Sequence, residues 1–425
     1  MKVTTTRIQR GVGQGGFHTA SLRLKSGHPL FEAELPYELT YDCGTNSVGP
    51  GGLAIKAFLQ RHIAEYAPAG GTVDALFISH LDQDHYNGAE QLCQTKTVSR
   101  IFLPYFSIDE IILFFLEQLA SDIAVSAAFA NAMLGIAGGG RQLFGIPVTV
   151  IGGPNITLRD PFPLNQPAGT GRLQAVVLAD DGKTYPIGSD IAAGANIALV
   201  AGTRLTPWML RPWSYKQSPE AQAMMTAMVN MNPQLKNLKG QPNGITVADL
   251  NSIKTNKDQI RATCQQIIAS AKGTIASDYN NHNAPSICLY SGPRSRMTHR
   301  YGTGYLDRGA SESLLSDNPA GWLTTGDALL QRHWSDFHDC YRDVLGLVGT
   351  YVIPHHGAQH NHSPDFVNTL GGRLAIICAR QRSEHHPSDV VLDALYRNNA
   401  VVKVVDEYAA HGLREIALIE TDDEF

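Results

Sequence analysis

Residues 73–85 read VDALFISHLDQDH, an apolar run that leads directly into four potential metal ligands. The run from Val73 to Ile78, which is apolar except for Asp74, predicts a strand that is buried on both faces. His80 and Asp82 are two positions apart, so on an extended chain they point to the same side and can share one ion. The turn that follows redirects Asp84 and His85 toward a second ion nearby. Because the strand delivers these groups to a defined sheet edge, the sequence favours a ligand site over a solvated polar loop.

Histidines are concentrated near the end of the chain. Six of the sixteen fall between residues 355 and 386: His355, His356, His360, His362, His385 and His386. The first pair ends a predicted strand, and the second pair precedes Pro387 and a predicted helix. Neighbouring residues on a strand face opposite ways, so we expect at most one member of each pair to reach a given ion. The other member would pack or form a hydrogen bond.

Asp327 is a further candidate ligand. It follows the predicted strand 321–324 and a Thr-Gly turn. A carboxylate at a strand end can bridge two ions, because its two oxygens carry several lone pairs. A Gly-Asp pair alone does not indicate a metal ligand. The assignment of Asp327 depends on the candidate ligands described above.

Bulk properties place the chain among ordinary globular proteins. It has 425 residues, of which 43% are hydrophobic and 17% charged, and its net charge is −5. Contact with nucleic acid would therefore need a local basic patch. The six cysteines are spread singly with no CxxC pair, which indicates reduced core thiols in a cytoplasmic protein. The N-terminus does not read as a secretory signal, and the uncharged run 123–140 reads as a buried helix, so we expect no membrane contact.

Element patterns divide the chain into three parts. Strands joined by glycine turns, with a helix at 54–66, fill the first hundred residues. Residues 108–136 and 217–272 read as helices, with short strands at 148–151, 173–178 and 197–201 between them. From Pro285 the alternation of strands and helices returns, with strands at 286–290, 321–324, 349–353, 374–378 and 401–405 and a helix at 388–397. We therefore expect residues 1–105 and 276–425 to form one α/β core, and residues 106–275 to form a partly helical insertion, a lid or a substrate or partner surface.

The order of these motifs resembles that of the metallo-β-lactamase superfamily, and within it the hydrolase domain of the DNA-uptake competence proteins and their stand-alone relatives. The resemblance covers residues 11 to about 105 and 280 to 420. It is carried by an ordered set of matches: Val-Gly-Gln-Gly at 12–15, Asp-Cys-Gly at 42–44, His-x-Asp-x-Asp-His at 80–85, Asn283 and Ser286, Leu-x-Thr-Gly-Asp at 323–327, Pro-His-His-Gly at 354–357, and His386-Pro387. Two positions depart from the family pattern. Ala358 stands where the subgroup usually has Ser, and Asn283, beside His282, stands where most of the superfamily has a further ligand motif.

The resemblance implies a four-layer αββα sandwich, here with a largely helical insertion, and a site for two metal ions. His80 and Asp82 would hold one ion. Asp84, His85 and a late histidine, from among His355, His356 and His386, would hold the other. Asp327 would bridge the two ions, while Asp42 and Asn283 would support the ligands from behind. Oxygen ligands in place of imidazoles favour manganese, with zinc as the competing ion.

Two ions about 3.5–4 Å apart can activate a bridging hydroxide for in-line attack at phosphorus. Asp84 is therefore a catalytic candidate, and His386 or the unligated member of His355-His356 is a candidate proton donor to the leaving group. The expected function is that of a phosphodiesterase or nuclease. The alternatives are a hydrolase of carboxylic esters, thioesters or lactones, and a non-catalytic binding module.

The expected substrate is phosphate-containing, either a nucleic acid or a nucleotide. Between Arg204 and Lys272 there are nine basic and three acidic residues, a net charge of +6 on a chain of −5. A basic segment of this kind would suit a polyanion that passes over the metal site. Arg204 and Arg211 are candidate phosphate contacts, and Trp208 and Trp213 could stack on bases. The alternative is a solvated helical face with ordinary core aromatics, and the sequence does not give the oligomeric state.

Overall fold

The computed structural model describes residues 2–25, 34–153, 171–202, 204–241, 244–270, 285–295, 300–306, 319–381, 383–408 and 411–420. The chain forms two compact units. The first consists of Met1–Pro104, Thr149–Ser214 and Ser286–Phe425. The second consists of Tyr105–Val148 and Tyr215–Pro285.

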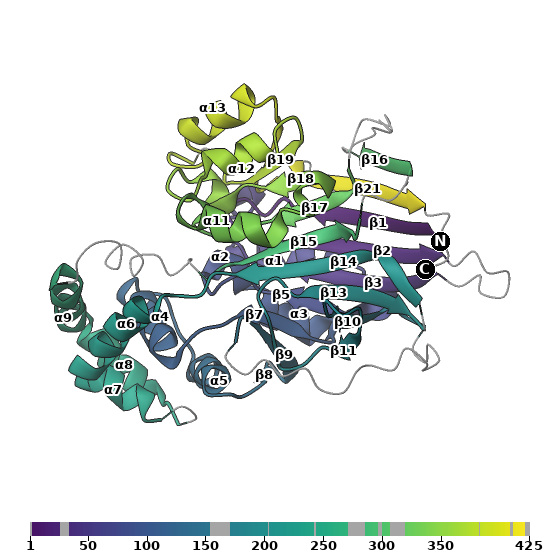
Figure 1. The fold of residues 1–425 in the computed structure, drawn as a ribbon. Helices are drawn as coiled ribbons and strands as arrows, with labels where there is room; N and C mark the ends of the chain where they lie inside the picture. The colour runs from purple at the N-terminus through teal and green to yellow at the C-terminus, as the bar shows by residue number, and fades with distance from the viewer. Residues whose placement is uncertain are drawn as a thin grey trace. The chain divides into compact units, whose positions relative to one another are not determined.

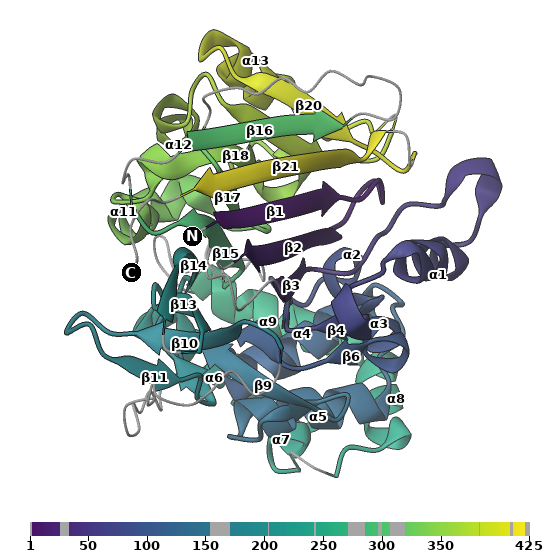
Figure 2. The same cartoon turned by 90° about the vertical axis from the view of Figure 1, so that its right-hand side faces the viewer.

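Within the described residues the first sheet has ten strands. Its order is β12 (Asp190–Ile191), β9 (Ile146–Ile151), β7 (Ile101–Pro104), β5 (Ala75–Phe77), β3 (Leu35–Tyr41), β2 (His18–Lys25), β1 (Lys2–Gln9), β21 (Leu413–Glu420) and β16 (Arg300–Leu306), with β8 (Gln142–Leu143) paired to β9. Strands β3, β5 and β7 are parallel, whereas β16, β21, β1, β2 and β3 form an antiparallel run (Figure 2). Along β1 buried and partly exposed residues alternate, so this part of the sheet has one face in the core.

The second sheet has nine strands in the described part of the chain. Its order is β11 (Thr184–Pro186), β10 (Gln174–Leu178), β13 (Asn196–Ala201), β14 (Arg204–Ser214), β15 (Ile287–Pro293), β17 (Gly321–Thr324), β18 (Val348–Val352), β19 (Leu374–Cys378) and β20 (Val401–Val405). The strands from β11 to β17 are antiparallel neighbours, and those from β17 to β20 are parallel. Each sheet therefore joins an antiparallel part to a parallel part.

The two sheets pack face to face around one apolar core. This core combines Leu22, Leu39 and Phe77 of the first sheet with Leu289 and Trp322 of the second. Helices α11 (Leu330–Tyr341), α12 (Pro364–Thr369) and α13 (Asp389–Arg397) lie together beside β17, β18 and β19 (Figure 1). Helices α1 (Ile55–Glu65) and α3 (Ala89–Thr95) lie to the right of β2 and β3 of the first sheet in Figure 2. The structure confirms the expected α/β class, with two facing sheets and helices beside them as in a four-layer αββα sandwich.

The second unit is largely helical. Its helices are α4 (Ile108–Ala120), α5 (Ala127–Ala137), α6 (Pro219–Met231), α7 (Pro233–Lys239), α8 (Val247–Thr255) and α9 (Lys257–Ser270). Helix α4 begins with a capping box in which Ser107 and Glu110 satisfy each other's backbone amides. Its apolar residues are buried along most of its length, and it contacts each of the other five helices. No helix in the described part of the chain combines the length and apolar character that a membrane span needs.

The unit boundaries differ from the division expected from the sequence. Residues 149–214, which the sequence places in the insertion, contribute strands to both sheets of the first unit. The short strands expected at 148–151, 173–178 and 197–201 are present as β9, β10 and β13. The difference arises because β14 was not anticipated: its eleven residues include two prolines and two tryptophans and show no simple alternation. This strand pairs with β13 on one side and β15 on the other, which joins the intervening strands to the core sheet.

Candidate metal centre

The site lies at the carboxyl ends of the parallel strands, where open α/β sheets usually place functional groups. Strand β3 ends at Tyr41 and is followed by Asp42, and β5 ends at Phe77 shortly before Ser79 and His80. A short helix, α2 (Gln83–Tyr86), then carries Asp84 and His85 inward, and both are buried. On the second sheet β17 leads to Asp327, and β18 leads to a turn that carries His355 and His356.

The turn after β18 has an unusual backbone. Consecutive residues His355 (φ 48°), His356 (φ 56°) and Gly357 (φ 84°) all lie in the left-handed region. Non-glycine residues seldom adopt this conformation, and where they do the surrounding structure must hold them there. The His355 amide donates to the Gly326 carbonyl (3.0 Å), which fixes the turn beside Asp327. This geometry overrides the strand-like alternation expected for the pair, so both histidines face the same cluster.

Imidazole and carboxylate groups converge around Asp327. Its Oδ1 lies 3.3 Å from His85 Nε2, and its Oδ2 lies 3.5 Å from His80 Nε2 and 3.6 Å from His355 Nε2. A second contact joins His356 Nε2 to Asp84 Oδ2 at 3.2 Å. Two trios, His80–His85–Asp327 and Asp84–His85–His356, each have ligand atoms within 4.8 Å of one another. They share His85, so the potential ligands form one continuous cluster.

The hydrogen bonds behind the four histidines determine which ring nitrogen faces the cluster. Nδ1 of His85 donates to Asp42 Oδ2 (2.8 Å), Nδ1 of His356 to the Cys378 carbonyl (2.7 Å), and Nδ1 of His355 to Asn361 Oδ1 (2.9 Å). Each of these partners is an acceptor, so the proton belongs on Nδ1.

The same holds for His80. The Ser79 hydroxyl gives its only proton to Asp42 Oδ2 (2.8 Å) and therefore accepts from His80 Nδ1 (2.9 Å). All four rings thus direct Nε2, the nitrogen that is available to bind a metal ion, toward the cluster. The buried Nε2 atoms of His80 and His85 have no hydrogen-bond partner among the described residues. Buried polar nitrogens in this state are what a metal ion would satisfy, so the residues fit a metal centre.

Backbone hydrogen bonds hold the segment 80–85, which carries four of the candidate ligands. The Gly16 amide donates to the Asp84 carbonyl (3.0 Å), the Gly44 amide to the Gly16 carbonyl (2.8 Å), and the Cys43 amide to the His85 carbonyl (2.8 Å). A Cβ on Gly16 would lie 2.8 Å from Asp42 Cβ. The glycine turn that opens the chain thus packs directly against the segments that carry Asp42 and Asp84.

Electrostatics follow from this packing of acids among imidazoles. Burial disfavours the charged form of Asp84, but the hydrogen bond with His356 outweighs it and lowers the pKa of Asp84 to about 2. Burial likewise opposes protonation of His80, yet the carboxylates of Asp327 and Asp82 raise its pKa to about 9. The pKa of His85 is raised by Asp327 and Asp42 despite burial. In the absence of metal, protons on the imidazoles compensate the buried carboxylates.

We therefore expect the metal-free protein to lose stability as the pH rises from about 6.5 to about 9, by on the order of 2 kcal/mol. The folded-state pKa of His80 is above its unfolded value of 6.5, so its stabilising contribution is complete below pH 6.5 and is lost through pH 9. Urea unfolding in the presence of a chelator measures this directly. Manganese-loaded protein should show no such loss, because deprotonation favours ligation. A pH-independent unfolding free energy of the metal-free protein would contradict these ion pairs.

The remaining candidate ligands occupy the edge of the cluster. Asp82 Oδ2 lies 3.7 Å from His80 Nε2, and the Asp82 side chain is 35% exposed. The His386 ring lies 5.7 Å from the ring of His355 and 6.3 Å from that of His356. Burial and the two neighbouring imidazoles lower the pKa of His386, which favours its neutral form. His385 is exposed, and Asn283 lies outside the described residues.

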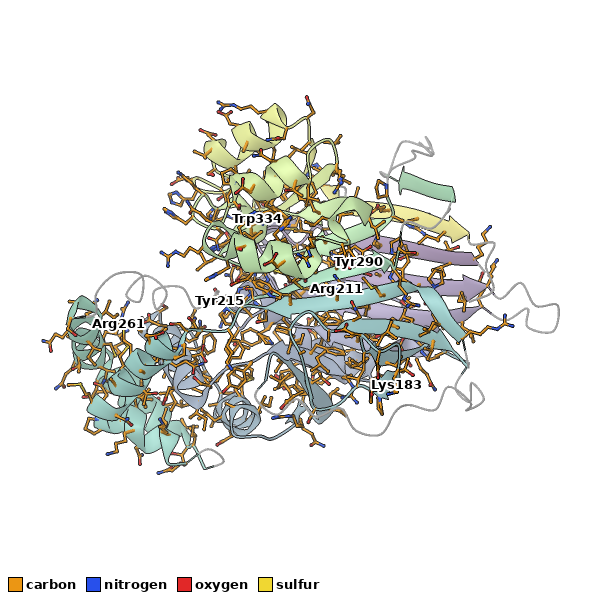
Figure 3. All side chains as sticks on the ribbon, viewed as in Figure 1. Lys183, Arg211, Tyr215, Arg261, Tyr290 and Trp334 are labelled. Carbon is orange, nitrogen blue, oxygen red and sulfur yellow. The ribbon has the colours of Figure 1, made fainter. Side chains whose placement is uncertain are left out.

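The structure does not support the expected base-stacking and phosphate contacts on β14. Trp208 is 1% exposed and belongs to the core between the sheets, where its Nε1 donates to Ser291 Oγ (3.1 Å). Trp213 is also buried, with its ring edge-to-face on Phe337. Arg211 is buried and paired with Asp343, and it lies on β14 as labelled in Figure 3. Only Arg204 is exposed, at the start of the strand.

The basic segment is also less positive than its sequence indicates. Most of its cations lie in the second unit, where acidic residues of α4 and its flanks face them. Lys239 pairs with Asp109, and Lys254 and Lys257 both pair with Asp122. Arg261, labelled on α9 in Figure 3, pairs with Glu117. These acids precede residue 204 in the chain, so they do not contribute to the net charge of residues 204–272.

Two residues of the site were not anticipated from the sequence. Ser79 links Asp42 to His80 through its hydroxyl, and its amide donates to Asp42 Oδ1 (2.7 Å). Asn361 accepts from His355 and donates to the Asp327 carbonyl (2.7 Å), so it ties the two ligand segments together. Ser79 immediately precedes His80, which was a usable signal. Asn361 had none beyond its place among the late histidines.

No family model matches the sequence, and no curated protein matches it either. Among solved structures, the chain is similar to the short form of human tRNase Z at 11% sequence identity, over 90% of this chain and 94% of that one, with a TM-score of 0.31. So distant a likeness carries no information about the site, whose assignment rests on the geometry described above.

Proposed function

We propose that this chain is a metal-dependent hydrolase that cleaves phosphodiesters with two divalent ions. The observation that carries the proposal is the set of four imidazoles whose Nδ1 atoms are all hydrogen-bonded to protein groups outside the cluster. Their Nε2 atoms face two buried carboxylates. A binding module would have no need to bury this many titratable groups around one point.

The geometry supports a division of the ligands between two ions. His80, Asp82 and His355 lie on one side of the cluster, and Asp84, His85 and His356 lie on the other. Asp327 offers one oxygen to His80 and His355 and the other to His85, which is the position of a bridging ligand. His386 adjoins both members of the late pair, and its neutral imidazole suits a ligand better than a proton donor.

Manganese is the proposed ion. Three of the seven groups in this division are carboxylates, and hard oxygen ligands favour manganese over zinc. Zinc remains the competing ion because four imidazoles also suit it. Metal exchange on one preparation distinguishes the two.

Two bound ions would supply a lowered pKa for a water molecule and stabilisation of charge in an in-line displacement at phosphorus. The chain's own residues orient that chemistry. Asp42 and Ser79 hold the rings of His80 and His85, and Asn361 holds the ring of His355. The Asp82 and His355 side chains are 35% and 31% exposed, whereas the other five of the seven groups divided between the ions are buried. The substrate therefore approaches from the side of these two residues.

Hydrolysis assays of the purified full-length chain test the proposal. Bis(p-nitrophenyl) phosphate, p-nitrophenyl acetate and labelled DNA and RNA would be incubated with the protein after chelation and after reloading with manganese or zinc. We expect metal-dependent cleavage of the diester, highest with manganese. Cleavage of the acetate alone, under every metal, would establish the ester hydrolase instead. Absence of hydrolysis in all arms would leave the binding module as the explanation.

A further inference from the structure

A surface pocket adjoins the metal centre. Its volume is about 690 Å³ including open solvent, and it is lined by Gln14, Arg380, Ser383, Glu384, His385 and His386. His386 is the one residue that the pocket shares with the cluster, because its ring contacts those of His355 and His356. The pocket is therefore next to the reacting position but separate from it.

Gln14 is held in this pocket by its backbone. Its amide donates to Ser47 Oγ (2.9 Å), and its carbonyl accepts from Thr45 Oγ1 (3.0 Å) and from the Asn46 amide (2.9 Å). The side-chain amide has no hydrogen-bond partner in the described part of the chain. A rigid backbone that presents an unengaged amide at a pocket wall is typical of a recognition residue, since little entropy is lost when it binds.

Arg380 enters the pocket from the second sheet. It lies two residues after β19, whose last residue, Cys378, accepts the hydrogen bond from His356. The Arg380 side chain is exposed, and it has no ion pair or side-chain hydrogen bond with any described residue. Buried or surface arginines elsewhere in this unit, such as Arg211 and Arg397, pair with carboxylates. The Arg380 guanidinium is therefore left available to pair with an anionic group of a ligand.

Ser383 fixes the conformation of the loop that lines this pocket. Its hydroxyl accepts from the amides of His385 (3.4 Å) and His386 (3.1 Å), which folds the loop so that both rings border the pocket. Glu384 is the one acid among the lining residues. The formal charges of Arg380 and Glu384 cancel in sum, but the two side chains form no ion pair with each other, so the Arg380 guanidinium remains the group that can bind an anion.

We propose that Gln14 and Arg380 form a subsite for a second phosphate of the substrate, next to the phosphodiester that is cleaved. The inference rests on the proposed function, and it narrows the substrate class to nucleotides or oligonucleotides that carry a phosphate adjacent to the scissile one. Arg380 supplies a bidentate, charge-assisted contact to phosphate oxygens, and the Gln14 amide donates a further hydrogen bond. A neutral ester or a lactone has no group that would use these donors.

Steady-state kinetics with the manganese-loaded full chain test the subsite. The substrates are a thymidine dinucleotide and the same dinucleotide with a 5′-phosphate. We expect KM to be about tenfold lower for the phosphorylated form, and Arg380→Gln to remove that difference while kcat stays within about twofold. Gln14→Ala should raise KM by about threefold, and Gln14→Glu by more because it adds a like charge. Glu384→Gln should lower KM for the phosphorylated form.

The matched control is Arg397→Gln, because Arg397 is an exposed arginine on α13 that pairs with Asp393 and with no other carboxylate of the described residues. Its KM for both dinucleotides should equal that of the unsubstituted chain. A second measurement does not depend on turnover: calorimetric binding of inorganic phosphate to the metal-free protein should weaken by about tenfold in Arg380→Gln and not in Arg397→Gln.

The outcomes separate the subsite from the proposed function. If neither dinucleotide is hydrolysed but phosphate binding depends on Arg380, the phosphodiesterase proposal fails and the anion subsite stands. If the dinucleotides are hydrolysed, and Arg380→Gln leaves both the KM difference and phosphate affinity unchanged, the subsite is overturned and the phosphodiesterase stands. Equal KM for the two dinucleotides, with phosphate binding that ignores Arg380, also overturns it.

Discussion

Replacement of Asp327 by Asn should abolish tight binding of both ions and lower kcat/KM for a phosphodiester by more than about 100-fold. Loss of a residue that hydrogen-bonds to a metal ligand typically lowers metal affinity or activity by about 10–100-fold, and loss of a ligand shared by two ions should lower them more. Asp327 is buried and lies within 3.6 Å of three imidazole Nε2 atoms. The amide keeps the shape of the side chain but removes the charge and one of the two acceptor oxygens.

Metal content after gel filtration and the diester assay measure this effect together. Asp339→Asn is the control, because Asp339 is exposed on α11 and its ion pair with Arg342 is long, at 4.0 Å. Circular dichroism establishes that each variant is folded. An Asp327→Asn protein that keeps both ions and normal activity would remove Asp327 from the centre.

A methyl group on Gly44 should be nearly as damaging, although Gly44 carries no chemistry. A Cβ at this position would lie 2.6 Å from the carbonyl carbon and oxygen of Asp84 and 2.7 Å from the amide nitrogen of His85. Since all three atoms are backbone, the peptide that joins the two ligands must move. We expect Gly44→Ala to lower unfolding free energy by about 1–3 kcal/mol, as overpacking does, and to weaken metal binding.

Gly188→Ala is the matched control for that substitution. Its Cβ would be 3.6 Å from the nearest atom, the Asp190 carbonyl oxygen, which is ordinary contact. Urea unfolding of the metal-free proteins measures the packing effect, and manganese titration measures the effect on the site. Equal stability and metal affinity of the two variants would show that the Asp-Cys-Gly segment does not position the ligand loop.

Much of the core could be predicted from local pattern. The middle of the run expected as a strand at 73–78 became β5, whereas Val73 belongs to a separate short strand, β4 (Thr72–Val73). The strands expected near 286–290, 321–324, 349–353, 374–378 and 401–405 became β15, β17, β18, β19 and β20, and the helix expected at 388–397 became α13. These elements are buried strands or amphipathic helices, whose periodicity records their environment. The structure also brings the motifs around His80, Asp327 and His355 together, as strand ends in one sandwich would require.

Other features depend on contacts that no local pattern encodes. Strand β14 reads as an aromatic and basic segment, but most of its side chains are buried because it is an interior strand. Trp208 packs in the core between the sheets, and Trp213 packs on Phe337 of α11. The left-handed turn at His355 and His356 is held by the hydrogen bond from the His355 amide to the carbonyl of Gly326, some thirty residues earlier. Gln14 and Arg380 lie at opposite ends of the sequence and meet only through the packing of the two sheets.

Metal stoichiometry of the chain and of Asp84→Asn tests the central claim most directly. Asp84 belongs to the trio with His85 and His356, but not to the trio of His80, His85 and Asp327. Elemental mass spectrometry of protein purified with manganese should find two ions per chain in the unsubstituted protein and at most one in Asp84→Asn. Two ions retained by Asp84→Asn, or none bound by the unsubstituted chain, would contradict the dinuclear centre.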